Sequence, residues 1–256
     1  MIIDMAAFVG PYERRPAKVP LPTDLADKLG PWGVTRVFAG RINHLRHENS
    51  NAVDFPIESF NRNGVEIQFV PVIDPTVASW RENLESYWTF HKASLPIIRL
   101  HPNYHGYQLS EHQAMPGLVQ WAHDHGSVLQ IVVNIDDIRR QHALGQVPDV
   151  ATADILNTAR KYPHQPFLLS GALMTLMRPL KADTLPNLWV DTARVETGLA
   201  LPILLENGWG DRLVYASHAP ILIAHSSIAR VLVDLSDADA LKILNGNARR
   251  LLRLNS

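Results

Sequence analysis

Short apolar runs alternate with longer amphipathic segments from one end of the chain to the other. The apolar runs are rich in Val, Ile and Leu and mostly lack strict alternation, the pattern of strands covered on both faces. Eight such runs predict strands: Ile2–Phe8, Val34–Gly40, Glu66–Ile73, Pro96–His101, Val128–Asn134, Pro166–Ser170, Asn187–Thr192 and Arg212–Ser217.

The amphipathic segments between these runs predict helices, because their apolar residues recur at helical spacing. The segments are Ser110–His125, Ala151–Tyr162, Ser79–Ala93, Thr197–Asn207 and Ile221–Asp234. Four glycines lie between helix and strand, where a left-handed C-cap is commonly needed: Gly64, Gly126, Gly208 and Gly210. A last helix over residues 236–253 begins at Ser236, with Asp239 three residues on as a partial capping box. We expect it to close the bottom or side of the domain.

Strand–helix alternation repeated about eight times predicts a single-domain (β/α)8 barrel, a TIM barrel, over residues 1–256. A doubly wound open sheet is the alternative. That fold usually has a glycine-rich phosphate turn after its first strand, and the segment FVGPYERRP has none. The proline-rich segment Pro11–Pro22 is expected to form an ordered loop over the barrel mouth.

Composition narrows the classes of partner. Lys and Arg number 24 against 25 Asp and Glu, and this balance argues against nucleic acid or an anionic membrane surface. The chain has no cysteine, which excludes disulfides, thiolate metal sites and thiol catalysis. Its longest apolar stretches, such as LALPILL, fall far short of the roughly 20 residues that span a bilayer. No signal-peptide pattern is present, so we expect a cytoplasmic protein.

Seven segments carry a family resemblance in a consistent order along the chain: MIID, PWGVTRVFAG, VEIQFVPVIDP, LPIIRLHPNYHGYQLSE, PNLWVDTA, GDRLVYASHAP and ILNGNARRLL. On these segments the chain resembles the amidohydrolase-related barrels of the amidohydrolase superfamily, the group that includes aminocarboxymuconate semialdehyde decarboxylase. The resemblance implies a hydrolase or carboxy-lyase on a metal-dependent-hydrolase-like barrel. It also implies a metal centre at the carboxyl ends of the strands, and a homodimer.

The resemblance implies ligands that this chain lacks. A pair of histidines two residues apart is expected on the first strand, because residues i and i+2 share a face. Further ligands are expected on the fifth, sixth and eighth strands. The corresponding residues here are Ala6, Phe8, Val132, Ser170 and His218. Ala, Phe and Val have no donor atom for a divalent cation. We therefore expect no metal cofactor, and we predict a degenerate metal site.

A rebuilt zinc site is the alternative, because the chain has 12 histidines. His101, His105 and His218 follow the fourth and eighth strands, and His44 and His47 follow the second, so all should approach one mouth. The opposing interpretation places His101 in a structural His-Pro turn and His105 in a solvated loop.

Polar residues gather at the predicted strand ends. The candidates for ligand binding are Arg41, Arg99, His101, Gln130, Asn134, Ser170, Asp191 and Arg194. Buried charges need partners, and Arg99 with Asp191 is one expected pair. Three arginines around one mouth suit a carboxylate or a phosphate, since the planar guanidinium binds such groups with two hydrogen bonds. Ion pairing or surface exposure explains each single arginine equally well.

His218 is the candidate catalytic residue, because a neutral imidazole is a general base near pH 7 without any metal. Ser217 should point to the opposite face, and Ser170 is a candidate hydroxyl partner. A packed core histidine is the alternative role for His218.

Three functions follow from these residues. The first is a metal-independent hydrolase or lyase acting on a small carboxylate-bearing substrate. The second is a catalytically inactive homologue, a pseudoenzyme, that binds a small anion or a protein partner. The third is a metal-dependent hydrolase with relocated histidine ligands. The barrel fold alone does not choose among them.

Overall fold

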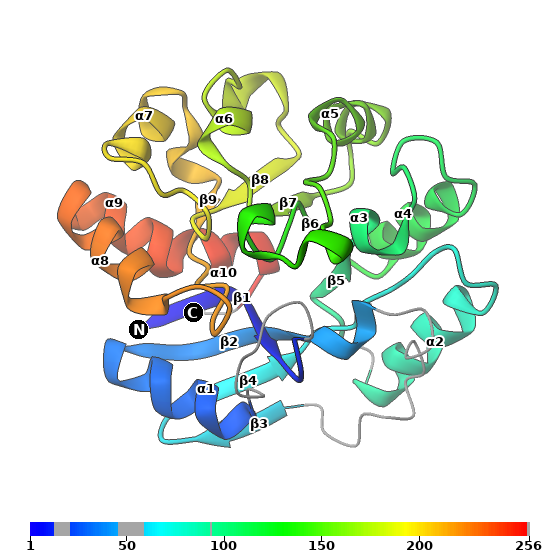
Figure 1. Cartoon of the computed structure of the whole chain (residues 1–256), viewed down its shortest axis with the longest axis horizontal. Coiled ribbons are helices and arrows are strands. Elements are labelled where there is room, and N and C mark those ends of the chain that lie inside the picture. Colours follow the sequence, from blue (N-terminus) through cyan, green and yellow to red (C-terminus); the bar gives the residue numbers. More distant parts are fainter. Residues whose placement is uncertain (13–20, 46–58, 93, 255–256) are drawn as a thin grey trace.

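Parallel strands form the centre of the molecule, and helices surround them (Figure 1). A computed structural model describes residues 1–12, 21–45, 59–92 and 94–254. The predicted loop Pro11–Pro22 and the candidate His47 lie largely or wholly outside these ranges. The parallel strands are β1 (Ile2–Val9), β2 (Val34–Arg41), β4 (Val65–Phe69), β5 (Ile97–Leu100), β6 (Val128–Val132), β7 (Phe167–Ser170), β8 (Leu188–Asp191) and β9 (Leu213–Val214).

The strands form two sheets that are hydrogen-bonded to each other at two seams, one between β4 and β5 and the other between β9 and β1. One sheet has the order β1-β2-β4-β3 and the other β5-β6-β7-β8-β9. At the first seam Val72 bridges Arg99, and the Ile73 amide donates to the Arg99 carbonyl at 3.0 Å. At the second seam the His218 amide donates to the Ala6 carbonyl at 2.8 Å, and the Phe8 amide donates to the Ala219 carbonyl at 2.8 Å. These bonds close the ring, so the predicted (β/α)8 barrel is confirmed.

The helices follow the strands in turn. They are α1 (Pro22–Leu29), α2 (Trp80–Phe90), α3 (Pro102–His105), α4 (Met115–Asp124), α5 (Thr152–Lys161), α6 (Met174–Met177), α7 (Ala200–Glu206), α8 (Ala224–Asp234), α9 (Asp237–Leu241) and α10 (Asn247–Leu252). Each predicted helical segment contains one of them. A π-helical turn, Lys242–Gly246, joins α9 to α10, so the predicted last helix is one nearly continuous unit. No helix in the described ranges is long and apolar enough to cross a membrane.

Strand alternation sorts the core into an outer and an inner part. Residues such as Ile98 and Leu129 belong to the large cluster under the helices. Met5 and Leu168 belong to a smaller cluster inside the barrel, and Leu251 of α10 packs against it. The last helix therefore contacts the inner cluster through Leu251.

One hairpin was not expected. Strand β3 (Ser59–Arg62) pairs antiparallel with β4, and the turn between them is Asn63-Gly64, with φ of 52° and 77°. Asn-Gly is the strongest short signal for such a hairpin, because both residues tolerate positive φ. Gly64 is therefore a hairpin residue and not the helix C-cap predicted for it.

Two strands end well before their predicted ends. Strand β4 stops at Phe69, although the prediction ran to Ile73, and Pro71 has no amide hydrogen for a ladder. Strand β9 has only two residues of the predicted Arg212–Ser217. Backbone groups of the residues after β9 bond across to β1 instead.

Candidate functional site

The ring of Phe8 fills the barrel interior at the carboxyl ends of the strands. Phe8 is 1% exposed. Its ring centroid lies 5.2 Å from that of His218, at 89°, and 6.5 Å from that of His101. The Arg99 guanidinium carbon lies 5.1 Å from the same centroid. An aromatic ring thus lies among three nitrogen-bearing side chains.

The side chains at the expected ligand positions do not fit a divalent metal. Ala6 packs in the inner cluster, and Phe8 packs with Val132, so these positions do face the interior. Hydrocarbon side chains supply no lone pair to a cation. Across the described ranges, no group of three His, Asp or Glu side chains is arranged to hold a metal ion. We therefore derive no chemical step from a metal.

Arg99 spans the barrel interior beneath Phe8. Its Nε donates to Gln130 Oε1 at 2.7 Å, and its Nη1 and Nη2 donate to the backbone carbonyls of Ala7 and Phe38 at 3.1 and 3.2 Å. Gln130 in turn donates to the Met5 carbonyl at 3.0 Å. Burial lowers the pKa of Arg99 to about 9, an effect offset in part by two carboxylates. These bonds join four strands internally and leave Arg99 fully enclosed.

Asp191 bonds elsewhere than to Arg99, contrary to the expected pairing. Its Oδ2 accepts from Ser170 Oγ at 2.6 Å, and its Oδ1 accepts from the backbone amides of Gly171 and Ala193 at 3.0 and 3.1 Å. Arg99 attracts Asp191 electrostatically without a direct bond. Burial raises the pKa of Asp191 to about 6, and the hydrogen bonds limit this rise.

Ser170 bridges Asp191 and His218. Its Oγ lies 2.8 Å from His218 Nε2, and His218 Nε2 lies 3.8 Å from Asp191 Oδ2. An ionised Asp191 accepts the single hydroxyl proton of Ser170, so Ser170 must accept a proton from His218 Nε2. In a Ser-His-Asp triad the histidine lies between the other two residues, whereas here the serine does. The arrangement is a chain of hydrogen bonds, which we call the relay, and it does not activate Ser170 as a nucleophile.

Burial keeps His218 neutral. Its side chain is fully buried, and burial, followed by the charges of Arg99 and Arg194, holds its pKa well below the usual 6.5. Ser217 points away from it, because Ser217 Oγ donates to Asp4 Oδ2 at 2.5 Å. The expected divergence of these neighbours is thus observed.

Four histidines considered for a rebuilt zinc site are buried: His44, His101, His105 and His218. Burial lowers the pKa of His44 to about 3 and that of His101 well below 6.5. His105 Nε2 pairs with the His44 backbone carbonyl at 3.1 Å, and its Nδ1 lies 3.9 Å from Asp74. His105 is thus buried and bonded, in contrast to the solvated loop residue that was the alternative.

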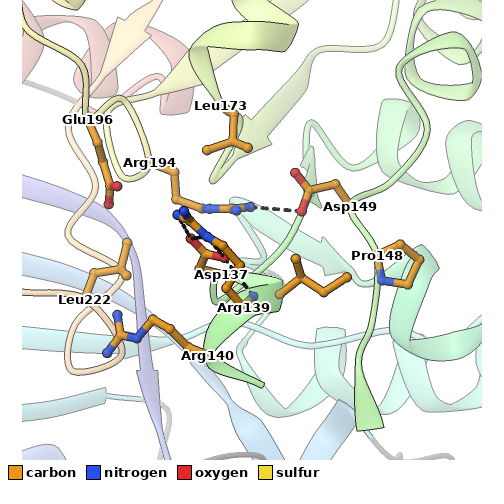
Figure 2. A pocket seen from close by; sticks show the side chains of 10 residues that line it. Asp137, Arg139, Arg140, Pro148, Asp149, Leu173, Arg194, Glu196 and Leu222 are labelled. Carbon is orange, nitrogen blue, oxygen red and sulfur yellow. Dashed lines mark hydrogen bonds and ion pairs between the residues drawn. The ribbon is translucent and has the colours of Figure 1, made fainter. Parts of the chain in front are cut away.

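A chamber of about 480 Å³ opens beside this buried network (Figure 2). Loops after β6, β7, β8 and β9 line it, with residues Asp137, Ile138, Arg139, Arg140, Pro148, Asp149, Leu173, Arg194, Glu196 and Leu222. We call it the mouth chamber. In Figure 2 the Arg194 side chain crosses it toward Asp149, and Glu196 and Leu222 lie on the opposite side. Arg194 Nη1 donates to Asp149 Oδ1 at 3.2 Å and to the Gly171 carbonyl at 3.3 Å.

Of the predicted binding residues, Arg194 lines the mouth chamber. Arg41 lies over the Phe69 ring, 5.1 Å from its centroid. Asn134 anchors the chamber loop, because its Nδ2 donates to the Val147 carbonyl and to Asp149 Oδ1 at 2.9 and 3.0 Å. The remaining candidates are buried and do not line the chamber: Arg99, His101, Gln130, Ser170, Asp191 and His218. The binding roles given to these residues stay predictions.

Sequence reasoning missed Arg139 and Arg140 of the chamber. Both belong to the run DDIRR, which begins at Asp136, shortly after β6 ends at Val132. A cluster of charges just after the carboxyl end of a barrel strand is the signal that could have indicated them, because such loops build the mouth.

Solved structures share this architecture, although no protein-family model matches the sequence and no curated protein matches it. The chain is similar to 5-carboxyvanillate decarboxylase from Sphingomonas paucimobilis, at 11% identity with a TM-score of 0.71 and 99% of each chain covered. It is similar to a probable 2-pyrone-4,6-dicarboxylic acid hydrolase from Acinetobacter baumannii, at 13% identity, TM-score 0.65 and 99% coverage of both. An uncharacterised TIM-barrel protein from Bordetella bronchiseptica matches at 16% identity, TM-score 0.62, covering 98% and 99%.

These matches define the class of fold. The chain has the amidohydrolase-like (β/α)8 fold that certain hydrolases and decarboxylases share, as the sequence resemblance predicts. At such low identity the likeness concerns the fold, and the residues of this chain must supply the functional argument.

Proposed function

We propose that this protein captures a small carboxylate-bearing molecule in the mouth chamber without a divalent metal. The observation that carries the proposal is the Phe8 ring, which occupies the interior among Arg99, His101 and His218. The chamber beside it has a volume of about 480 Å³, within the range of small-molecule pockets.

Arg194 is the residue that we assign to hold the carboxylate. Its guanidinium is anchored through Nη1, and Nε and Nη2 donate to no group in the described part of the chain. Nη1 is fixed on a loop residue and on the Gly171 carbonyl, so the free donors are already oriented. A carboxylate can take two of them in parallel, the geometry that guanidinium favours.

Capture is favoured over turnover because the relay residues are buried and do not contact the mouth chamber. His218 and Ser170 are each 0% exposed, and neither lines the mouth chamber. Gly171 separates the chamber from His218, since its carbonyl accepts from Arg194 while its Cα lies against the imidazole. A general base must reach the proton that it removes.

A second function rests on the relay itself. The two short contacts of Ser170 would pass a proton between Asp191 and His218. If a substrate displaces the Gly171 segment, His218 becomes the general base of a metal-independent hydrolase or carboxy-lyase. The names of the similar structures point to aromatic and pyrone carboxylates as the first compounds to try.

The test of capture is isothermal titration with a panel of small carboxylates, including citrate, benzoate and hydroxybenzoates. We expect at least one to bind wild type, and Arg194→Gln to weaken that binding about tenfold or more, because a charge-assisted pair is lost. Arg160→Gln, an exposed arginine of α5, is the matched control and should bind as wild type does. Binding that Arg194→Gln leaves unchanged would contradict the proposal, and so would no binding across the panel.

The test of turnover uses the compounds that bind. Product analysis of wild type against His218→Gln decides it, because the amide keeps the size of the side chain without a basic nitrogen. Equal turnover by both proteins would remove the relay from the chemistry. No product from either would leave capture as the function.

A further inference from the structure

A second, smaller cavity adjoins the mouth chamber. It has a volume of about 130 Å³ and shares Arg140, Glu196 and Leu222 with the chamber as a common wall. Its other lining residues come from the loops after β8 and β9 and from α8: Ala193, Ser217, Ile223, Ser226, Ser227 and Arg230. We call this cavity the recess.

Arg230 enters the recess with an unsatisfied guanidinium. Its Nη1 is buried without a hydrogen-bond partner, and its Nε makes one long bond to the Ser226 carbonyl at 3.4 Å. Burial lowers the pKa of Arg230, and Glu196 and Asp234 oppose that effect from a distance without forming an ion pair with it. A buried donor without an acceptor costs free energy, roughly 1–3 kcal/mol in proteins.

The charge balance differs between the two cavities. Three arginines line the mouth chamber, and Asp137, Asp149 and Glu196 balance them. In the recess Arg140 and Arg230 face Glu196 alone, so its lining has a formal charge of +1. Arg140 is held only loosely, since its Nη1 lies 3.7 Å from Asp136. The recess is therefore the more electropositive cavity.

Hydroxyl groups complete the lining. Ser226 Oγ donates to the Ile223 carbonyl at 2.8 Å, and Ser227 Oγ donates to the Ala224 carbonyl at 2.9 Å. These are local bonds within the first turn of α8, and a hydroxyl can rotate to donate to another acceptor. Ser217 Oγ is already engaged with Asp4.

We propose that the recess is an oxyanion site in which Arg230, with Arg140 and the hydroxyls of Ser226 and Ser227, binds a carboxylate or phosphate group. An acceptor there would satisfy Arg230 Nη1 and balance the excess charge. Where the proposed capture in the mouth chamber also holds, the occupant is a molecule with two anionic groups. One group then lies at Arg194 and the other in the recess across the shared wall.

The experiment uses inorganic phosphate and acetate as separate probes on the full chain, measured by isothermal titration. We expect one or both to bind wild type, and Arg230→Gln to weaken that binding about tenfold or more. Arg194→Gln and the exposed-site control Arg160→Gln should keep it. Stronger binding of phosphate than of acetate would identify the favoured oxyanion.

Two results would overturn the oxyanion site: no binding of either probe to wild type, or equal binding by wild type and Arg230→Gln. Loss of probe binding in Arg194→Gln alone would also contradict it, because that result would place the anion in the mouth chamber. Arg230→Lys covers a folding failure of Arg230→Gln. It keeps the charge but loses the planar donor set, and we expect intermediate affinity. Circular dichroism of each variant verifies that it is folded.

Discussion

Gly171 is the residue at which the mouth chamber and the buried relay meet. Its φ is +70°, and a Cβ there would lie 2.5 Å from the Asn134 carbonyl oxygen and 2.6 Å from His218 Cε1. Both neighbours are held, the first in the backbone and the second by Ser170. Glycine is required here for two separate reasons, its backbone angle and the lack of space.

Gly171→Ala should therefore destabilise the protein by about 2–4 kcal/mol, measured by urea unfolding. Gly64→Ala is the matched control, since Gly64 has a φ of +77° but nothing within 4 Å of its Cβ position. It should cost about 1 kcal/mol from the backbone angle alone. Similar losses for both variants would show that the space beside His218 is not limiting.

Asp4 ties the first strand to the end of the last one. Its Oδ1 accepts from the amides of Ala6 and Ser217 at 3.1 and 3.0 Å. Burial raises its pKa to about 7 from the usual 3.8, although its hydrogen bonds with Ser217 and Ala6 oppose the rise. Between these two values the folded protein holds a proton that the unfolded chain has lost.

Asp4 therefore makes the free energy of unfolding fall as pH rises from about 4 to about 7. Buried His44 acts in the opposite direction, because its lowered pKa makes stability rise with pH over much of that range. The quantity to measure is therefore the free energy of unfolding of wild type minus that of Asp4→Asn, from urea unfolding at several pH values. We expect this difference to decline toward pH 7. A constant difference would show that Asp4 does not titrate in this range.

At the scale of elements, the start of α9 is fixed by Ser236. Its Oγ accepts from the Asp239 amide at 3.2 Å and donates to Asp239 Oδ2 at 2.7 Å. Ser236→Ala should cost about 1 kcal/mol in thermal or urea unfolding, because an N-cap bond is lost. Ser86→Ala in the middle of α2 should be neutral or slightly stabilising, since Ala is the better residue inside a helix. An unchanged stability for Ser236→Ala would contradict the capping role.

The sequence pattern predicts the barrel well because strands that are buried on both faces have apolar residues at successive positions. It fails where single residues decide the backbone, as at Pro71, which ends β4, and at Asn63-Gly64, which turns the hairpin. It predicts the polar rim but not which cavity each side chain joins. Arg99 and Arg194 look alike in the sequence, yet one is enclosed by backbone carbonyls and the other lines the chamber.

At the scale of the whole molecule, a protein with Ala6, Phe8 and Val132 at the expected ligand positions should bind no metal, and metals should not affect its stability. Elemental analysis of purified protein should find zinc, iron and manganese far below one per chain. Dialysis against EDTA should leave the melting temperature unchanged, because no metal contributes to folding. A stoichiometric metal, or a loss of stability on chelation, would contradict a metal-independent protein and return attention to His101, His105 and His218.

One wall of the mouth chamber is formed by the loop of residues 137–149, which lies over a barrel with its own core. Asn134 and Arg194 fasten this loop to the strands. This loop therefore lies in a different stretch of chain from the strands that form the core, the arrangement that lets surface loops vary in barrel proteins. Under the proposed capture, replacing the loop between Asn134 and Asp149 while keeping both residues offers a route to new ligand preferences on an unchanged scaffold.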